Sequence, residues 1–158
     1  MKTLVIGYGN TLRSDDGVGF LVAEEVAEWN LPNLRSLAVH QLLPELAAEI
    51  AQVEEVFFID AWEDLGNEHH DRPRLERLQP NASPCSLDHS WSPSVLLHLA
   101  STLYHSDPVA YQILIPARQF DFGTSLSAIA KDGMDWSLNV MKAHLTTDRE
   151  QLPCTKLA

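Results

Sequence analysis

Two adjacent acids, Asp15 and Asp16, follow the first apolar run of the chain, and Gly17 and Gly19 come directly after them. One acid is enough to cap the N-terminus of a helix, and glycine is a poor residue for a first helical turn. The glycines therefore indicate a close approach to the backbone. We expect Asp16 to face a cation or a substrate, and helix capping by the two acids is the alternative.

Asp60 ends the most apolar run of the chain, residues 56–59. In open α/β sheets, ligands bind at the carboxyl ends of the strands, and a charge that ends a buried strand usually has a partner or a task. The loop that carries Asp16 opens at the same edge, so two carboxylates from separate loops could converge there. The alternative is that Asp60 only begins a turn.

Histidine supplies a third kind of functional group. His89 comes just before a predicted helix, and His40 ends a predicted strand at residues 34–40, again at the carboxyl edge. Two carboxylates and one imidazole form an open divalent-metal site with nitrogen and oxygen ligands. Asp16 and Asp60 are therefore candidate metal ligands, together with His89 or His40.

Several familiar site motifs are missing. The dinucleotide-binding fingerprint needs a glycine where Leu12 stands, and no Gly-Lys-Ser/Thr segment is present. Cys85 and Cys154 form no Cys-x-x-Cys pair. Neither Gly-x-Ser-x-Gly nor His-Glu-x-x-His occurs. These absences argue against a bound dinucleotide, a serine nucleophile and a resident catalytic zinc.

Apolar runs alternate with helical spacings along the chain, which indicates an α/β sheet. The continuous apolar runs are typical of parallel strands that are buried on both faces. We predict strands at residues 3–6, 34–40, 56–59 and 111–115 with an edge strand at 73–78, and helices at 17–29, 44–51, 93–104 and 126–145.

Length and charge limit the number of domains and the kinds of partner that we expect for this chain. The chain of 158 residues predicts one domain, residues 1–158, with a short polar tail at 146–158. Its 22 acidic and 11 basic residues give a net charge of −11, so we expect neither nucleic acid nor a membrane as a partner. No run has the length of a membrane span or the pattern of a signal peptide, and we expect a cytoplasmic protein.

The chain resembles the maturation endopeptidases of nickel–iron hydrogenases, from Leu4 to about Val140. The segment 7–19, which reads GYGNTLRSDDGVG, carries the most specific similarity. The segment Ile-Asp-Ala around Asp60 is the second match, and His89 with the leucines that follow it is the third.

The resemblance implies a fold and a function. The fold would be a three-layer α/β/α sandwich around a mostly parallel, twisted sheet of about five strands. The activity would be removal of the C-terminal extension of the hydrogenase large-subunit precursor after nickel insertion. The family's metal-contacting residues correspond to Asp16, Asp60 and His89. The nickel would be supplied by the substrate, so no resident cofactor is expected.

Two departures from the family pattern stand out. Many relatives have Glu at the position of Asp16, and many have an Asp followed by glycines where this chain has His40 and Gln41. The His-Gln pair resembles the branch that serves the bidirectional, NAD(P)-linked hydrogenase of cyanobacteria. His40 and Gln41 are therefore candidate substrate-binding residues, and His40 could also be a metal contact or a packing residue.

The reaction that these residues suggest is hydrolysis of one peptide bond by an activated water molecule. Asp16 and Asp60 are the candidate catalytic residues, because a carboxylate can accept a proton from water. Nickel could instead polarise the carbonyl group or the water, and both routes stay open. A different class of function is also open, in which the same side chains sense or bind nickel in the loaded subunit and cut nothing.

Overall fold

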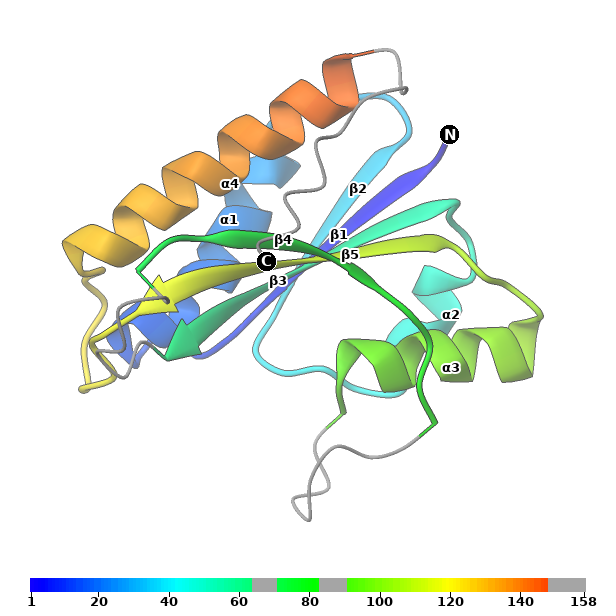
Figure 1. The fold of residues 1–158 in the computed structure, drawn as a ribbon, viewed down its shortest axis with the longest axis horizontal. Coiled ribbons are helices and arrows are strands. Elements are labelled where there is room, and N and C mark those ends of the chain that lie inside the picture. The colour runs from blue at the N-terminus through cyan, green and yellow to red at the C-terminus, as the bar shows by residue number, and fades with distance from the viewer. Residues whose placement is uncertain (64–70, 83–90, 148–158) are drawn as a thin grey trace.

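A five-stranded sheet forms the middle layer of the molecule, in a computed structural model that describes residues 1–63, 71–82 and 91–147 (Figure 1). The strand order is β2-β1-β3-β5-β4. Among the described residues, β2, β1, β3 and β5 are parallel, and β4 at one edge is antiparallel. The strands are β1 (Thr3–Tyr8), β2 (Leu34–Val39), β3 (Glu55–Glu63), β4 (Arg74–Leu78) and β5 (Val109–Ala117).

Helices cover both faces of this sheet (Figure 1). On one face lie α1 (Val18–Ala27) and α4 (Ala128–Thr146), and on the other lie α2 (Leu46–Ile50) and α3 (Pro93–Tyr104). The expected α/β fold with three layers and a mostly parallel, five-stranded sheet is therefore confirmed. Over the described ranges, no helix is both long and apolar enough to cross a membrane.

Each central strand contributes to two apolar clusters, because successive side chains of a strand point to opposite faces. In β3, Val56 and Phe58 pack with the residues of α2 and α3, whereas Phe57 and Ile59 pack with those of α1 and α4. All four side chains are almost fully buried. This double burial explains why the run is apolar without interruption.

Glycines let the start of α1 pack directly on the strand ends. A Cβ atom at Gly19 would collide with the carbonyl oxygen of Ile59 and would lie 2.8 Å from that of Tyr8. Gly9 has a φ of +144°, and a Cβ atom there would collide with the carbonyl oxygen of Asp16. The close approach that the glycines indicate is therefore an approach of the protein's own backbone.

Asp15 is fully buried, and its carboxylate accepts four hydrogen bonds from the segment that precedes α4. The donors are the backbone N–H groups of Arg118, Gln119 and Ser127 and the Ser127 hydroxyl, at 2.6 to 3.0 Å. Ser127 in turn caps α4. Burial alone would raise the pKa of the Asp15 carboxyl, but these hydrogen bonds outweigh it and lower the pKa below its ordinary value.

The structure contradicts the alternative role of the two acids, which was helix capping. The 3₁₀ turn Ser14–Gly17 leads into α1, and neither this turn nor α1 has a side-chain cap. Asp15 instead stabilises the segment 118–127, which connects β5 to α4. Backbone hydrogen bonds between Ser14 and Gly123 at 2.8 Å and between Asp15 and Gln119 at 2.9 Å complete this connection.

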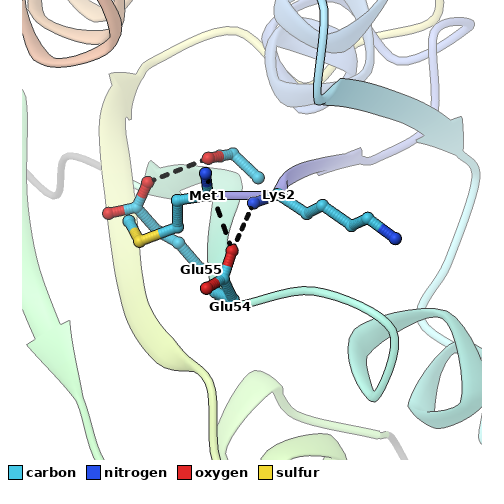
Figure 2. Close-up of polar contacts among 5 residues, drawn as sticks. Met1, Lys2, Glu54 and Glu55 are labelled. Atoms are coloured by element: carbon cyan, nitrogen blue, oxygen red, sulfur yellow. Dashed lines mark hydrogen bonds and ion pairs between the residues drawn. The ribbon is translucent and has the colours of Figure 1, made fainter.

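Acidic side chains also fasten the opposite end of the sheet, where β1 and β3 begin (Figure 2). The Glu54 carboxylate accepts a hydrogen bond from the Lys2 N–H at 2.7 Å and lies 3.7 Å from the amino group of Met1. Glu55 is buried and accepts a hydrogen bond from the Thr3 hydroxyl at 3.1 Å. These contacts stabilise the parallel pairing of β1 with β3 far from the edge where ligands are expected.

Two strands extend beyond their predicted ends. β3 continues to Glu63, because its last residues pair with β5, so Asp60 lies inside the strand. β5 continues through Pro116 to Ala117, beyond its predicted end at residue 115. The neighbouring β4 stops opposite Leu114, so the missing N–H of proline leaves no ladder hydrogen bond unmade on that side. α4 ends at Thr146, the first residue of the predicted tail, and residues 148–158 lie outside the described ranges.

Asp15→Asn is expected to lower the free energy of unfolding by roughly 3 kcal/mol, because an amide NH₂ would replace a buried carboxylate oxygen that accepts hydrogen bonds. The folded-state pKa of Asp15 is lowered, so the stabilisation is present above the unfolded pKa of about 3.9 and is lost as pH falls through the folded value. Urea unfolding at pH 7 and at pH 3 measures both effects.

Asp135→Asn is the matched control, because Asp135 is an exposed aspartate on α4. It should change the free energy of unfolding by less than about 0.5 kcal/mol at either pH. If Asp15→Asn were as stable as this control at pH 7, the buried carboxylate would not be what holds the segment 118–127.

Candidate functional site

A cleft of about 440 Å³ lies at the carboxyl edge of the sheet. It opens where β1 ends, beside the loop that follows β2 and the residues that precede α3. The cleft therefore lies at the edge where α/β folds bind their ligands. Its lining residues are Tyr8, Gly9, Asp16, His40, Gln41, Leu42, Leu43, Asp60 and Trp91.

Asp16 is half-buried in this cleft, and the loop that carries it fixes its carboxylate. One carboxylate oxygen accepts a hydrogen bond from the Asn10 N–H at 2.9 Å. The Asn10 side chain in turn accepts the Leu12 N–H at 2.9 Å, which closes the loop on itself. Asp16 is thus oriented by one N–H group, and much of its charge is available to a ligand.

The sheet register places Asp60 at the floor of the cleft. β1 pairs with β3 up to Gly7 and Ile59, so Asp60 is the next residue of β3 and lies beside Tyr8. It shares the face of Phe58, which α2 and α3 cover. The Asp60 carboxyl thus follows the apolar side chains of Val56 and Phe58 on the same face of β3, and it lines the cleft.

Burial raises the pKa of the Asp60 carboxyl to about 6. The neighbouring Tyr8 hydroxyl and the Ala61 N–H act in the opposite direction, because they stabilise the ionised form. The negative charge of Asp16 adds to the increase. This last effect shows that Asp16 lies close enough for its charge to act on the Asp60 carboxyl.

Tyr8 is a polar neighbour that the sequence analysis missed. Burial raises the pKa of its phenol well above the ordinary value, and the charge of Asp60 raises it further. Gln112 of β5 also interacts with the hydroxyl by a hydrogen bond that favours the ionised form. Tyr8 therefore stays a neutral hydrogen-bond donor. Tyr8 lies beside Asp60 because of the register in which β1 pairs with β3, and this register cannot be read from the sequence.

His40 and Gln41 line the same cleft from the loop after β2, and both are exposed. The His40 ring stacks on Phe20 of α1, with 5.1 Å between ring centroids and 15° between ring planes. This stacking fixes the orientation of the imidazole. The structure thus brings four of the five candidate site residues into one cleft: Asp16, Asp60, His40 and Gln41.

The fifth candidate, His89, lies outside the described residues. Trp91, two positions later, does line the cleft, and the sequence analysis did not single it out. Within residues 1–63, 71–82 and 91–147, no three His, Cys, Asp or Glu side chains form a group that could hold a metal ion. The described part of the site therefore offers two carboxylates, and the predicted imidazole ligand is not among its residues.

This arrangement favours acid–base chemistry. A carboxylate with a pKa of about 6 is ionised at neutral pH and is still basic enough to accept a proton from water. The neighbouring Asp16 can bind a cation or stabilise a positive charge that a ligand carries. A peptide-sized ligand is compatible with a cleft of about 440 Å³.

Comparison with known proteins gives structural neighbours and no sequence match. No protein-family model matches the chain. No curated protein sequence matches it significantly. The solved structures that share its fold include several hydrogenase maturation proteases.

Three of these structures cover nearly the whole chain. The NiFe hydrogenase maturation protease HycI from Thermococcus kodakarensis has a TM-score of 0.72 at 20% identity, over 92% of this chain and 93% of its own. The hydrogenase maturating endopeptidase HybD from E. coli has a TM-score of 0.71 at 19% identity, over 92% of each chain. The hydrogenase 2 maturation peptidase from a Thaumarchaeota archaeon has 0.68 at 20%, over 94% and 100%. At these identities, the likeness establishes the fold.

Asp60→Asn is expected to raise the free energy of unfolding at pH 7 by about 2 kcal/mol, because the folded protein no longer has to bury a charge. The folded-state pKa of Asp60 is raised to about 6. Wild-type protein should therefore lose stability as pH rises from about 4 to 6, and the variant should lack that part of the decrease. Urea unfolding across this range measures the difference.

Asp15→Asn serves as the comparison, since removal of that charge should act in the opposite direction. Identical pH dependence of unfolding in wild type and Asp60→Asn would contradict the raised pKa.

Proposed function

We propose that this chain is an endopeptidase that removes the C-terminal extension of a NiFe hydrogenase large-subunit precursor after nickel insertion. The observation that carries the proposal is the meeting of Asp16 and Asp60 in one cleft, on a fold shared with hydrogenase maturation proteases. The resemblance of segment 7–19 to these endopeptidases supports it independently of the fold.

Asp60 is the proposed general base. Its carboxylate accepts a proton from a water molecule, whose oxygen attacks the carbonyl carbon of the scissile bond. The carbon–nitrogen bond then breaks, and the proton passes to the leaving amine. A pKa of about 6 suits this exchange, because the group is ionised at neutral pH and also gives the proton back readily. Tyr8 is placed to hold the Asp60 carboxyl in position.

Nickel enters this scheme as part of the substrate. Asp16, Asp60 and His89 are the proposed contacts of the nickel in the loaded precursor, since oxygen and imidazole ligands together suit such a divalent ion. The protein itself then needs no resident cofactor. Two routes to the same hydrolysis differ in what activates the water: the Asp60 carboxylate alone, or the carboxylate together with substrate nickel.

His40 and Gln41 are the proposed contacts to the precursor around the metal. Both are exposed at the mouth of the cleft, and stacking on Phe20 holds the His40 ring in place. The proposed branch is the one that serves the cyanobacterial bidirectional, NAD(P)-linked hydrogenase, which the His-Gln pair resembles. The proposed setting is the cytoplasm, with no membrane or nucleic-acid partner.

Incubation of the purified chain with nickel-loaded precursor tests the proposal, with intact-mass spectrometry as the readout. The precursor should lose a C-terminal peptide, and nickel-free precursor should stay intact. Binding of loaded precursor without cleavage would replace the enzyme with the alternative, a nickel-sensing or nickel-binding module. Loss of the peptide from nickel-free precursor at an equal rate would remove nickel from the recognition step.

Asp60→Asn should lower the cleavage rate by at least 100-fold, which is the usual contribution of a general base. Because the variant is expected to fold stably, the loss can be assigned to chemistry. Asp135→Asn, on α4 away from the cleft, should cleave at the wild-type rate. Near-normal cleavage by folded Asp60→Asn protein would make Asp60 a structural residue only.

His89→Ala should weaken cleavage through recognition of the nickel-loaded precursor, because imidazole favours nickel whereas carboxylates alone favour harder cations. A neutral imidazole is the ligand, so wild-type recognition should fade as pH falls through about 6.5. The rate of cleavage of nickel-loaded precursor is measured from about pH 5.5 to about pH 7.5 for wild type, His89→Ala and a control, His98→Ala. His98 is an exposed residue of α3. An unchanged rate and pH profile in His89→Ala would remove His89 from the metal contacts.

A further inference from the structure

The acidic cleft also has an apolar part, made by Leu42, Leu43 and Trp91. Leu42 is only 6% exposed and belongs to the core that α2 and α3 cover. Leu43 is 43% exposed and Trp91 is 36% exposed. Two large apolar side chains from separate segments thus meet solvent beside the carboxylates.

Both exposed side chains are on well-anchored backbone. The Leu43 carbonyl accepts the Leu46 N–H at 3.1 Å, which attaches it to the first turn of α2. Trp91 directly precedes Ser92, whose hydroxyl caps α3 by accepting the Val95 N–H at 3.3 Å. These hydrogen bonds hold the backbone that carries the two side chains, so less conformational entropy is lost when a ligand binds.

The position of the apolar surface beside the carboxylates indicates which part of a substrate would contact it. A peptide whose scissile carbonyl lies at Asp60 has to pass through the same cleft, which Leu43 and Trp91 also line. Successive side chains of an extended peptide point to opposite sides, and their Cα atoms are about 3.8 Å apart. One of the two residues that flank the scissile bond therefore faces the wall of the cleft, and the apolar part of that wall suits a large apolar side chain.

We propose that Trp91 and Leu43 form a subsite for one large apolar side chain of the precursor, next to the bond that is cut. The subsite rests on the proposed endopeptidase function and adds to it the chemical class of residue that the cleft selects. Burial of this side chain removes apolar surface of both partners from water, which favours binding of the correct precursor.

Truncation of either residue is expected to weaken binding without affecting the chemical step. Trp91→Ala and Leu43→Ala should each raise KM for the nickel-loaded precursor about tenfold and leave kcat within about twofold, as expected when binding is lost equally from ground and transition states. Trp91→Phe should restore most of the affinity, because an aromatic ring still fills the subsite.

Two exposed apolar residues away from the cleft provide matched controls. Tyr104, 49% exposed, ends the helix that Trp91 precedes, and Leu31, 37% exposed, lies before β2 rather than after it. Tyr104→Ala and Leu31→Ala should leave KM unchanged. Circular dichroism of each variant should show the wild-type fold.

The precursor provides the second arm of the experiment. After mass spectrometry has located the cut, each apolar residue within about three positions of it, the reach of an extended chain across the cleft, is replaced by alanine. One replacement should raise KM for wild-type protein about tenfold and have little further effect on Trp91→Ala. Such non-additivity is the signature of direct contact.

Unchanged KM in both Trp91→Ala and Leu43→Ala, or fully additive effects with every precursor variant, would overturn the subsite while the endopeptidase function stands. A wild-type chain that cleaves no precursor would overturn both.

Discussion

The buried carboxylate of Asp15 is the interaction on which the site depends. It joins the loop after β1 to the segment 118–127, and four donors satisfy its charge. With Asp15 held in this way, the next residue is directed to the cleft, where the Asn10 N–H orients the Asp16 carboxylate. Two adjacent acids therefore have different tasks: Asp15 stabilises the loops, and Asp16 is left to act on a ligand.

Asp60 is the residue of the site whose ionised form is destabilised by folding. Its carboxyl continues a face of β3 that is otherwise apolar, and burial together with the charge of Asp16 raises its pKa to about 6. The Asp60 carboxylate, which is ionised at neutral pH, is therefore less stable in the folded state than in the unfolded chain. Asp15 has the opposite property, because hydrogen bonds favour its ionised form. This contrast between the environments of Asp15 and Asp60 separates a candidate catalytic group from a structural one.

Sequence patterns predicted much of the fold, because central parallel strands need uninterrupted apolar runs. The meeting of Asp16 with Asp60 was also predictable, since Asp16 comes from the loop after β1 and Asp60 ends the apolar run of β3 at the same sheet edge. The place of Tyr8 beside Asp60 was not, because it depends on strand register. The partners of Asp15 come from a segment distant in sequence, and no local pattern announces them. Trp91 was missed for the same reason, since only the packing of α3 brings it to the cleft.

The pKa of Asp60 in the folded protein tests this account most directly. Carboxyl carbon chemical shifts, followed by NMR while pH is varied, give the midpoint for each aspartate. The account predicts that Asp60 titrates near 6 and that Asp16→Asn lowers this midpoint, whereas Asp15 titrates below its ordinary value. A midpoint for Asp60 near the ordinary value of about 3.9, unchanged in Asp16→Asn, would contradict the account, because the two carboxylates would then not share one desolvated site.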